Sequence, residues 1–263
     1  MLLQVLERHI IRKDEVLLMA CERIDFLGVP LDILKKEDIE NEILRLLNEH
    51  KPVQIIFLST WDILRARRKG EFQDMVTSSA LCLPISKSII KGASFLKKSI
   101  PERHYPFETI ISILNVINSH SKSLYMLGAT KRSLAIAEDN VKSTFKELKF
   151  VGRYNGYYKA NMEPSIISAI VKAAPSFVIL GNGIKGGARW IYRNKSKLSN
   201  GIYIYDNNII DIFSKYKKKT SNFLFRHGLE YLPQVFCNPL KIFTVFKYCW
   251  FKILLIFYRI RNK

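Results

Sequence analysis

A strand–helix–strand pattern at residues 123–158 constrains the fold of this chain most strongly. A short apolar run ends just before Gly128, residues 131–145 have helical periodicity, and a second apolar run at 149–151 precedes Tyr157. Two strands joined by a helix pair in parallel, so this unit predicts a parallel sheet. Glycine after such a strand lets a phosphate approach the backbone and the start of the next helix.

The rest of the chain repeats this alternation of strands and helices. Apolar runs predict six strands, at residues 53–58, 80–83, 123–127, 149–151, 176–180 and 202–205. Helical periodicity predicts helices at residues 36–48, 62–78, 88–97, 107–118, 131–145, 164–172 and 188–197. The predicted fold is therefore α/β and Rossmann-like, a mainly parallel sheet flanked by helices. We expect this domain to span residues 23–214, after an N-terminal extension at residues 1–22, and to bind ligands at the carboxyl ends of its strands.

Residues 215–263 differ in composition and are predicted to form a basic, amphipathic, helical appendage. From Ser214 onward the chain has eleven basic residues and one acidic residue, a net charge of +10 out of +19 for the whole chain. Such a segment suits an anionic membrane surface. The basic residues expected to contact it are Lys241, Lys247, Lys252 and Arg259. The alternative is a terminal helix docked on its own domain, with its lysines in solvent.

Other features of the chain narrow its class. No run of 18 uncharged apolar residues occurs, so no spanning helix is predicted. Four widely separated cysteines suit reduced thiols in the cytoplasm, and with the basic appendage the expected location is cytoplasmic and peripheral, on the inner face of the cell membrane. Neither metal-ligand spacing nor an Asp-x-Asp motif is present, so no metal is predicted. The basic cluster at 215–219 accompanies no nucleic-acid motif, so no nucleic-acid partner is expected, and a homo-oligomer is compatible with the sequence.

A glycine-rich loop at residues 181–186 matches the GxGxxG pattern of dinucleotide-binding proteins, and Asp206 ends the next predicted strand. Its place in the chain argues against a nicotinamide or flavin site, because dinucleotide folds carry this loop on their first strand. Only 57 residues follow Asp206, too few for a second half. A loop that cradles a sugar-nucleotide diphosphate fits better, and a tight turn without a ligand is the structural alternative.

Several short motifs resemble, in order and spacing, those of the WecG/TagA/CpsF family of bacterial glycosyltransferases. The segments that carry the resemblance, within residues 24–250, are 24–34, 80–84, 101–103, 127–129, 151–158, 181–183 with Trp190, Asp211, 228–232 and 238–239. Each motif is modest alone, but their shared order is specific.

The resemblance implies a sugar transferase at a membrane surface. What the resemblance implies is that the chain, like members of that family, transfers an N-acetylmannosamine-type sugar from a UDP-sugar donor to a polyprenyl-diphosphate-linked sugar, in cell-surface polysaccharide biosynthesis. The donor is a substrate, so no cofactor is implied. The resemblance also implies that a basic C-terminal appendage holds the enzyme to the cytoplasmic leaflet.

This chain departs from the family pattern at the general base. The family has Asp-Gly after its Leu-Pro pair, where this chain has Ile85-Ser86, and isoleucine cannot accept a proton. A Gln-Glu pair of the family is replaced here by Gly187-Ala188. One hypothesis is a divergent enzyme, with another carboxylate as base or with a different donor or acceptor. The other is a non-catalytic, membrane-associated binding protein on the same fold.

The residues predicted for catalysis are Arg103, Glu108 and Asp62. Arg103, in the motif at 101–103, would neutralise diphosphate charge with its two-pronged guanidinium, unless it pairs with Glu102 or Glu108. Either Glu108 or Asp62 would replace the missing base. The residues predicted to bind substrate or nucleotide are Ser59, Ser86, Gly128, Tyr157, Gly181, Gly183 and Asp211. Each has a structural alternative. Turn geometry would equally explain the glycines, packing would explain Tyr157, and capping of a helix would explain Asp211.

Overall fold

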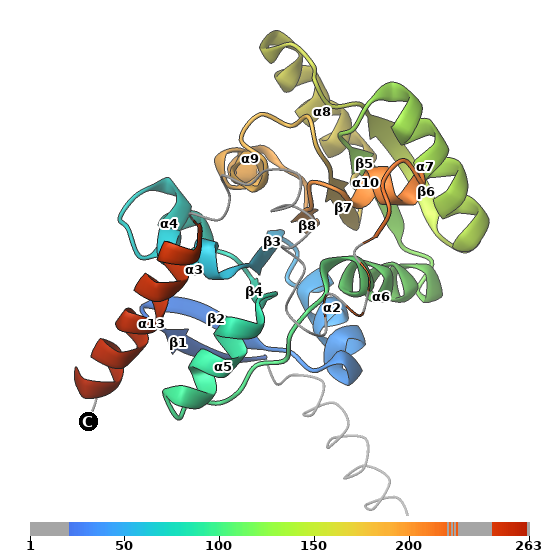
Figure 1. The fold of residues 1–263 in the computed structure, drawn as a ribbon. Coiled ribbons are helices and arrows are strands. Elements are labelled where there is room, and N and C mark those ends of the chain that lie inside the picture. The colour runs from blue at the N-terminus through green and yellow to red at the C-terminus, as the bar shows by residue number, and fades with distance from the viewer. Residues whose placement is uncertain (1–20, 220, 222, 224, 226–243, 262–263) are drawn as a thin grey trace, which may run out of the picture.

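The computed structural model of the chain describes residues 21–219, 221, 223, 225 and 244–261 (Figure 1). Most of the predicted N-terminal extension, the motifs at 228–232 and 238–239, and Lys241 lie outside these residues.

A six-stranded parallel sheet forms the centre of the domain, with strand order β4-β3-β8-β7-β5-β6. The strands are β3 (Pro52–Leu58), β4 (Leu81–Pro84), β5 (Ser123–Leu127), β6 (Lys149–Tyr154), β7 (Phe177–Leu180) and β8 (Gly201–Tyr205). All six predicted strands and the parallel α/β class are confirmed. The central strands are apolar throughout because helices cover both faces of the sheet.

A two-stranded antiparallel hairpin, β1 (Glu22–Phe26) and β2 (Val29–Ile33), lies beside the main sheet and is absent from the predicted strands. Its turn residues Leu27 and Gly28 both have positive φ, which matches the right-handed twist of a tight hairpin. The buried Asp32 fastens it. Its carboxylate accepts hydrogen bonds from both arms of Arg23, at 2.7 and 2.8 Å, and from the backbone N–H of Cys82 in β4, at 2.6 Å.

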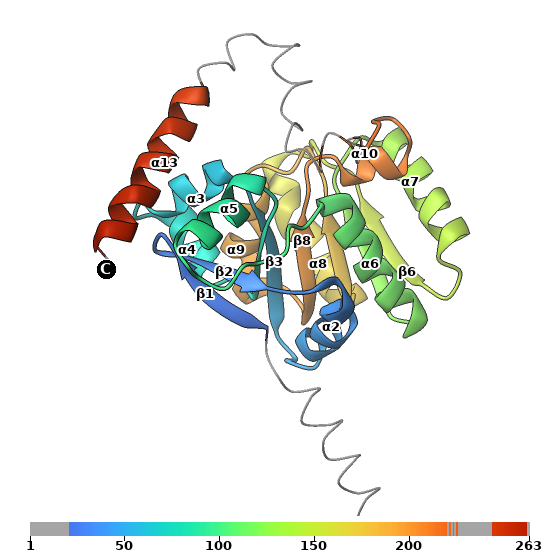
Figure 2. The same cartoon turned by 60° about the horizontal axis from the view of Figure 1, so that its bottom comes forward.

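Helices follow the strands in the predicted alternation (Figure 2). The α-helices are α2 (Ile39–Leu47), α3 (Thr60–Ala66), α4 (Glu71–Thr77), α5 (Lys87–Phe95), α6 (Pro106–Ser119), α7 (Lys131–Thr144), α8 (Glu163–Ala173), α9 (Ala188–Asn194), α10 (Ile209–Phe213) and α13 (Thr244–Arg261). Short 3-10 turns are η1 (Lys36–Asp38), η2 (Ala160–Met162) and η3 (Lys195–Lys197). The single helix predicted at 62–78 is wrong: Gly70, with φ +138°, separates α3 from α4.

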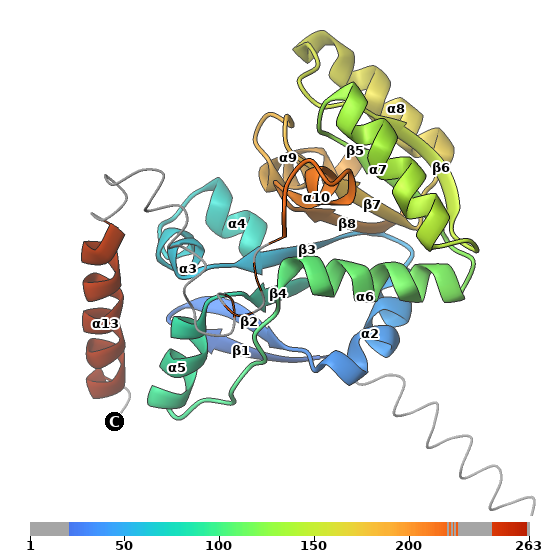
Figure 3. The same cartoon turned by 45° about the vertical axis from the view of Figure 1, so that its right-hand side comes forward.

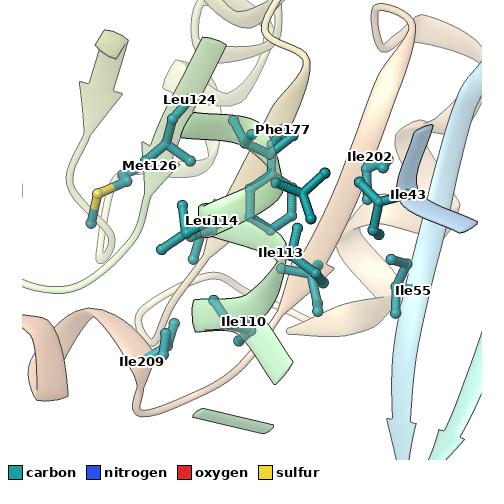
Figure 4. Close-up of a cluster of buried hydrophobic side chains, with 14 of the residues drawn as sticks. Ile43, Ile55, Ile110, Ile113, Leu114, Leu124, Met126, Phe177, Ile202 and Ile209 are labelled. Carbon is teal, nitrogen blue, oxygen red and sulfur yellow. The ribbon is translucent and has the colours of Figure 1, made fainter. Parts of the chain in front are cut away.

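The two faces of the sheet are covered by different sets of helices (Figure 3). Helices α2, α6, α7 and α10 cover one face. There Ile110 and Ile113 of α6 lie against strand side chains such as Phe177 and Ile202, all buried (Figure 4). The other face is covered by α8 and α9 over the β5–β7 half, and by the hairpin, α3, α4, α5 and α13 over β3 and β4. Because all six strands run parallel, their carboxyl ends lie along one edge of the sheet.

The buried His104 predicts a pH dependence of stability. Burial lowers its pKa from 6.5 to about 4, although its Nε2 lies 3.0 Å from the carbonyl oxygen of Leu34 and that bond favours the charged form. Between pH 6.5 and 4 the unfolded state binds the proton and the folded state does not. The free energy of unfolding is therefore expected to fall on acidification, by about 3 kcal/mol from this residue. Urea unfolding from pH 7 to 4 checks this; His104→Gln should remove that part of the slope, and an unchanged slope contradicts the assignment.

Candidate functional site

The carboxyl ends of the parallel strands bring most of the predicted site residues to one edge. Ser59 and Asp62 follow β3, Ser86 follows β4, and the remaining predicted binding residues follow β5, β6, β7 and β8. Arg103 joins them, because its Nε donates a hydrogen bond to the carbonyl oxygen of Ile85, at 2.6 Å. In open α/β sheets this edge is where ligands bind.

Polar side chains cluster where β3 and β4 end. The backbone N–H of Thr60, which is 1% exposed, donates to the hydroxyl of Ser86 at 3.2 Å. Ser59 is the N-cap of α3 and forms a capping box with Asp62. Oδ2 of Asp62 accepts from the backbone N–H of Ser59 at 2.9 Å and from its hydroxyl at 2.6 Å. The first turn of α3 thus fixes this carboxylate next to the loop that carries Ile85.

Asp62 carries a shifted pKa. Burial raises the pKa of its carboxyl above the ordinary value of 3.8, while the hydrogen bonds from Ser59 and the charge of Arg65 lower it and only partly offset burial. Both hydrogen bonds from Ser59 fall on Oδ2, and Oδ1 takes part in neither. A carboxylate with a raised pKa and an oxygen outside its cap is chemically suited to accept a proton.

Arg103 is held against the C-terminal part of the chain. Its guanidinium carbon lies 3.7 Å from the centroid of the Phe225 ring, and its Nη1 donates to the Phe225 carbonyl oxygen. The proposed alternative partners contact Lys36: Glu102 accepts from its backbone N–H at 3.3 Å, and Glu108 lies 3.8 Å from its ammonium group. The stacking on Phe225 keeps the planar guanidinium in one orientation.

A cavity of about 370 Å³ opens beside Arg103. It is lined by Lys36, Lys87, Ile90, Arg103, Tyr105, Glu108 and Phe225. Three of these side chains are cationic and one is a carboxylate, so the cavity carries a net positive charge that attracts a phosphate or diphosphate. The structure therefore places two predicted catalytic residues, Arg103 and Glu108, in one cavity, and the third, Asp62, at the end of the neighbouring strand β3.

The residue at the expected base position is held by its backbone. The N–H of Ile85 donates to the carbonyl oxygen of Leu58 at 3.0 Å, and its own carbonyl accepts from Arg103. The loop is therefore held between β3 and Arg103, although the side chain of Ile85 has no proton-accepting group.

Asp206 is a carboxylate at this edge that was not among the predicted site residues. It follows β8, the strand between β3 and β7, and its Oδ1 accepts from the backbone N–H of Asn208 at 2.8 Å. Burial raises its pKa, against the opposing effect of backbone hydrogen bonds from Asn208 and Ile209. The signal in the sequence is an acidic residue directly after a fully apolar strand, at the level where ligands bind.

The loops after β5, β6 and β7 are joined to one another by backbone hydrogen bonds. Ala129 N–H donates to the Asn182 carbonyl and Tyr157 N–H to the Gly183 carbonyl, both at 2.8 Å. Gly128 has φ +129°, and a Cβ there would lie 2.8 Å from the backbone nitrogen of Gly181. Packing between the loops is thus sufficient to explain these glycines, and their role in nucleotide binding stays a prediction.

Tyr157 is the most exposed predicted binding residue, at 67%. It adopts φ +58°, an unusual conformation for a residue with a side chain, and a Cβ on Gly183 would lie 2.7 Å from its ring. An aromatic face in solvent at the carboxyl edge is available for stacking on a base or sugar.

Asp211 anchors α10 rather than capping it. Its Oδ1 accepts from the hydroxyl of Ser133 in α7, and its Oδ2 accepts from Nδ2 of Asn182 in the β7 loop, both at 2.8 Å. The Lys217 ammonium lies 3.4 Å from the same Oδ2. This buried carboxylate therefore positions the glycine-rich loop, and its contact with a substrate stays a prediction.

Helix α13 packs on the domain with one face and exposes an apolar surface on the other. Phe251 and Leu255 are 2% and 8% exposed, and the ring centroids of Phe251 and Phe26 lie 6.2 Å apart. The opposite side chains, 42–67% exposed, are Trp250, Ile253, Ile256, Phe257 and Ile260. The described part of the segment is therefore a terminal helix docked on its own domain, and its contact with a membrane stays a prediction.

The predicted basic contacts of the appendage have different surroundings. Lys252 is exposed, whereas the Arg259 guanidinium lies 4.4 Å from the centroid of the Phe95 ring. Lys241 and the side chain of Lys247 lie outside the described residues. None of the described helices has the length and apolar character needed to cross a membrane.

Comparison with known proteins identifies the family. The family model described as "Glycosyl transferase WecG/TagA/CpsF family" matches residues 24–263. The chain is also 21% identical over 209 residues to the N-acetylglucosaminyldiphosphoundecaprenol N-acetyl-beta-D-mannosaminyltransferase of Bacillus subtilis (strain 168). That similarity covers 80% of this chain and 78% of the relative. Because the family match extends over nearly the whole chain, this protein belongs to the WecG/TagA/CpsF family of glycosyl transferases.

Proposed function

We propose that this protein transfers an N-acetylmannosamine-type sugar from a UDP-sugar to a polyprenyl-diphosphate-linked sugar, in cell-surface polysaccharide biosynthesis. The name of the Bacillus subtilis relative supports this substrate class, since it describes transfer of such a sugar to a diphosphoundecaprenol-linked acceptor. The observation that carries the proposal is the positive cavity at Arg103, located at the edge where α/β sheets bind ligands.

The proposed reaction is one displacement at the sugar. The acceptor hydroxyl oxygen bonds to the anomeric carbon, the bond from that carbon to the UDP oxygen breaks, and UDP leaves with the electron pair. Arg103, Lys36 and Lys87 would neutralise the negative charge that develops on the diphosphate. The hydroxyl proton must pass to a base as the new bond forms.

Asp62 is the base that we propose. Ser86, which follows Ile85, is hydrogen-bonded to Thr60, so the loop that lacks the family's aspartate lies against the helix turn that carries Asp62. Burial raises the pKa of Asp62 toward the range where a carboxylate works as a base, and its Oδ1 is outside the capping box. The carboxylate of Glu108 lies 3.8 Å from the Lys36 ammonium, so it is already engaged in an ion pair.

The direct test is a transfer assay with the full chain. Radiolabelled UDP-N-acetylmannosamine is incubated with an N-acetylglucosaminyl-diphospholipid, and both labelled lipid and released UDP are measured. Lipid labelling that requires both substrates is expected. The second candidate function, a non-catalytic binding protein, is favoured by Ile85 at the base position. It predicts that the protein binds the acceptor lipid and yields neither product.

The exposed apolar face of α13 is proposed to rest on the inner leaflet of the cell membrane. Phe257→Glu, at a side chain that is 65% exposed, should lower affinity for phosphatidylglycerol vesicles by about tenfold or more, because a buried Phe contributes about 1.5–3 kcal/mol. Vesicle sedimentation measures this, and Ile136→Glu, on the exposed side of α7, is the matched control. Equal binding of both variants contradicts the proposal, as does equally strong binding of the wild type to duplex DNA.

A further inference from the structure

A groove between α3 and α13 is distinct from the cavity at Arg103. It encloses about 670 Å³ and is lined by Trp61, Leu64, Arg65, Arg67, Arg68, Trp250 and Leu254. The helices meet at one end, where the ring centroids of Trp61 and Tyr248 lie 4.7 Å apart in an edge-to-face contact. Its walls are therefore aromatic and aliphatic, and its charged groups are all arginines.

The arginines of the groove have few partners in the part of the chain that the structure describes. None of the described lining residues is acidic, and no described carboxylate forms an ion pair with Arg65, Arg67 or Arg68. The Nη1 of Arg67 is buried and has no hydrogen-bond partner among the described atoms. The groove thus presents three guanidinium groups with no carboxylate among its described lining residues, which favours an anionic ligand. If the Arg67 guanidinium contacted only the C-terminal end of α3, its Nη1 would have no acceptor.

The groove is continuous with two functional surfaces. Trp250, which is 56% exposed, belongs both to the groove and to the apolar face of α13. At the other wall, Arg65 lies close enough to Asp62 for its charge to lower the pKa of that carboxyl. A ligand held here would therefore lie between the exposed apolar face of α13 and α3, the helix whose first turn carries Asp62.

We infer that this groove binds the phosphate and the first isoprene units of the polyprenyl-diphosphate acceptor. The arginines would hold a phosphate oxygen by charge-assisted hydrogen bonds, and the two Trp and two Leu side chains would hold the hydrocarbon chain. This inference rests on the proposed function, because it assigns a place to the lipid part of that acceptor.

Isothermal titration of the full chain with farnesyl diphosphate tests the inference. The double variant Arg67→Gln/Arg68→Gln is expected to bind it at least about tenfold more weakly than the wild type, as the loss of a charge-assisted hydrogen bond predicts. Arg67→Lys/Arg68→Lys should bind with intermediate affinity. The matched control is Lys146→Gln/Lys172→Gln, which removes the same charge from exposed positions on other elements and should bind like the wild type. Circular dichroism establishes that each variant is folded.

Two further titrations distinguish the source of the phosphate. Inorganic diphosphate should bind at least about tenfold more weakly than farnesyl diphosphate, since it lacks the chain; equal affinities overturn the inference. The inference is also overturned if Arg67→Gln/Arg68→Gln loses its binding to phosphatidylglycerol vesicles but keeps its affinity for farnesyl diphosphate, because the groove would then bind a phospholipid. Arginine-dependent farnesyl diphosphate binding without sugar transfer supports the groove and contradicts the proposed function. Sugar transfer with unchanged binding by the double variant supports the function and contradicts the groove.

Discussion

Asp62→Asn is expected to lower the rate of sugar transfer by about 10²–10⁴-fold, the usual effect of removing a general base. Asparagine retains a side-chain oxygen that can accept the backbone N–H of Ser59, so the cap of α3 and the fold should persist. The measurement is the rate of lipid labelling at saturating donor, with Asp139→Asn on the exposed side of α7 as the matched control.

The pH profile gives this prediction a second readout. Burial raises the pKa of Asp62 above 3.8, so the carboxylate becomes protonated, and the rate falls, at a higher pH than for an exposed aspartate. The acid limb of the wild-type profile should be absent from the residual activity of Asp62→Asn. If Asp62→Asn retains full activity and Glu108→Gln loses it, the base is Glu108 in the Arg103 cavity. Full activity in both variants excludes both carboxylates and leaves Asp206 as the next to test.

Gly128→Ala is expected to destabilise the fold by about 2–5 kcal/mol, a large part of the stability of a typical domain. Strain from φ +129° contributes about 1–2 kcal/mol, and a Cβ 2.8 Å from the backbone of Gly181 adds an overpacking cost of about 1–3 kcal/mol. Gly70→Ala is the matched control, because Gly70 has φ +138° and nothing within 4 Å of the added Cβ.

Urea unfolding of both variants measures the difference. Gly70→Ala should lose only the strain term, so the gap between the two reports the contact of the β5 and β7 loops. Equal losses would show that these loops separate easily, and that Gly128 is available to a ligand's phosphate rather than committed to packing.

Most of the sheet could be predicted from the sequence because strands such as β4, β7 and β8 are buried on both faces and are therefore apolar throughout, whereas the edge strand β6 alternates exposed and half-buried residues. The hairpin was not among the predicted strands, because β1 is largely exposed and carries charged residues, and the hairpin is fastened by Asp32 reaching Cys82, 50 residues away. The division of 62–78 into two helices depends on Gly70, since helical periodicity alone continues through that residue.

For the candidate site, the sequence could predict which residues lie at the same edge of the sheet. Residues after strands can be assigned to one edge once the sheet is parallel, which placed Ser59, Ser86 and Asp62 correctly together. Their individual roles depend on tertiary contacts, such as the stacking of Arg103 on Phe225, 122 residues away. Asp211 likewise required the structure, because its partners come from α7 and from the β7 loop.

A crystal structure of the chain with UDP bound tests most directly whether the carboxyl edge is the sugar-transfer site. The diphosphate is predicted to lie in the cavity lined by Arg103, Lys36 and Lys87. UDP bound instead in the separate 470 Å³ cavity beside α8 and α9, which Lys185 and Trp190 line, would contradict the account.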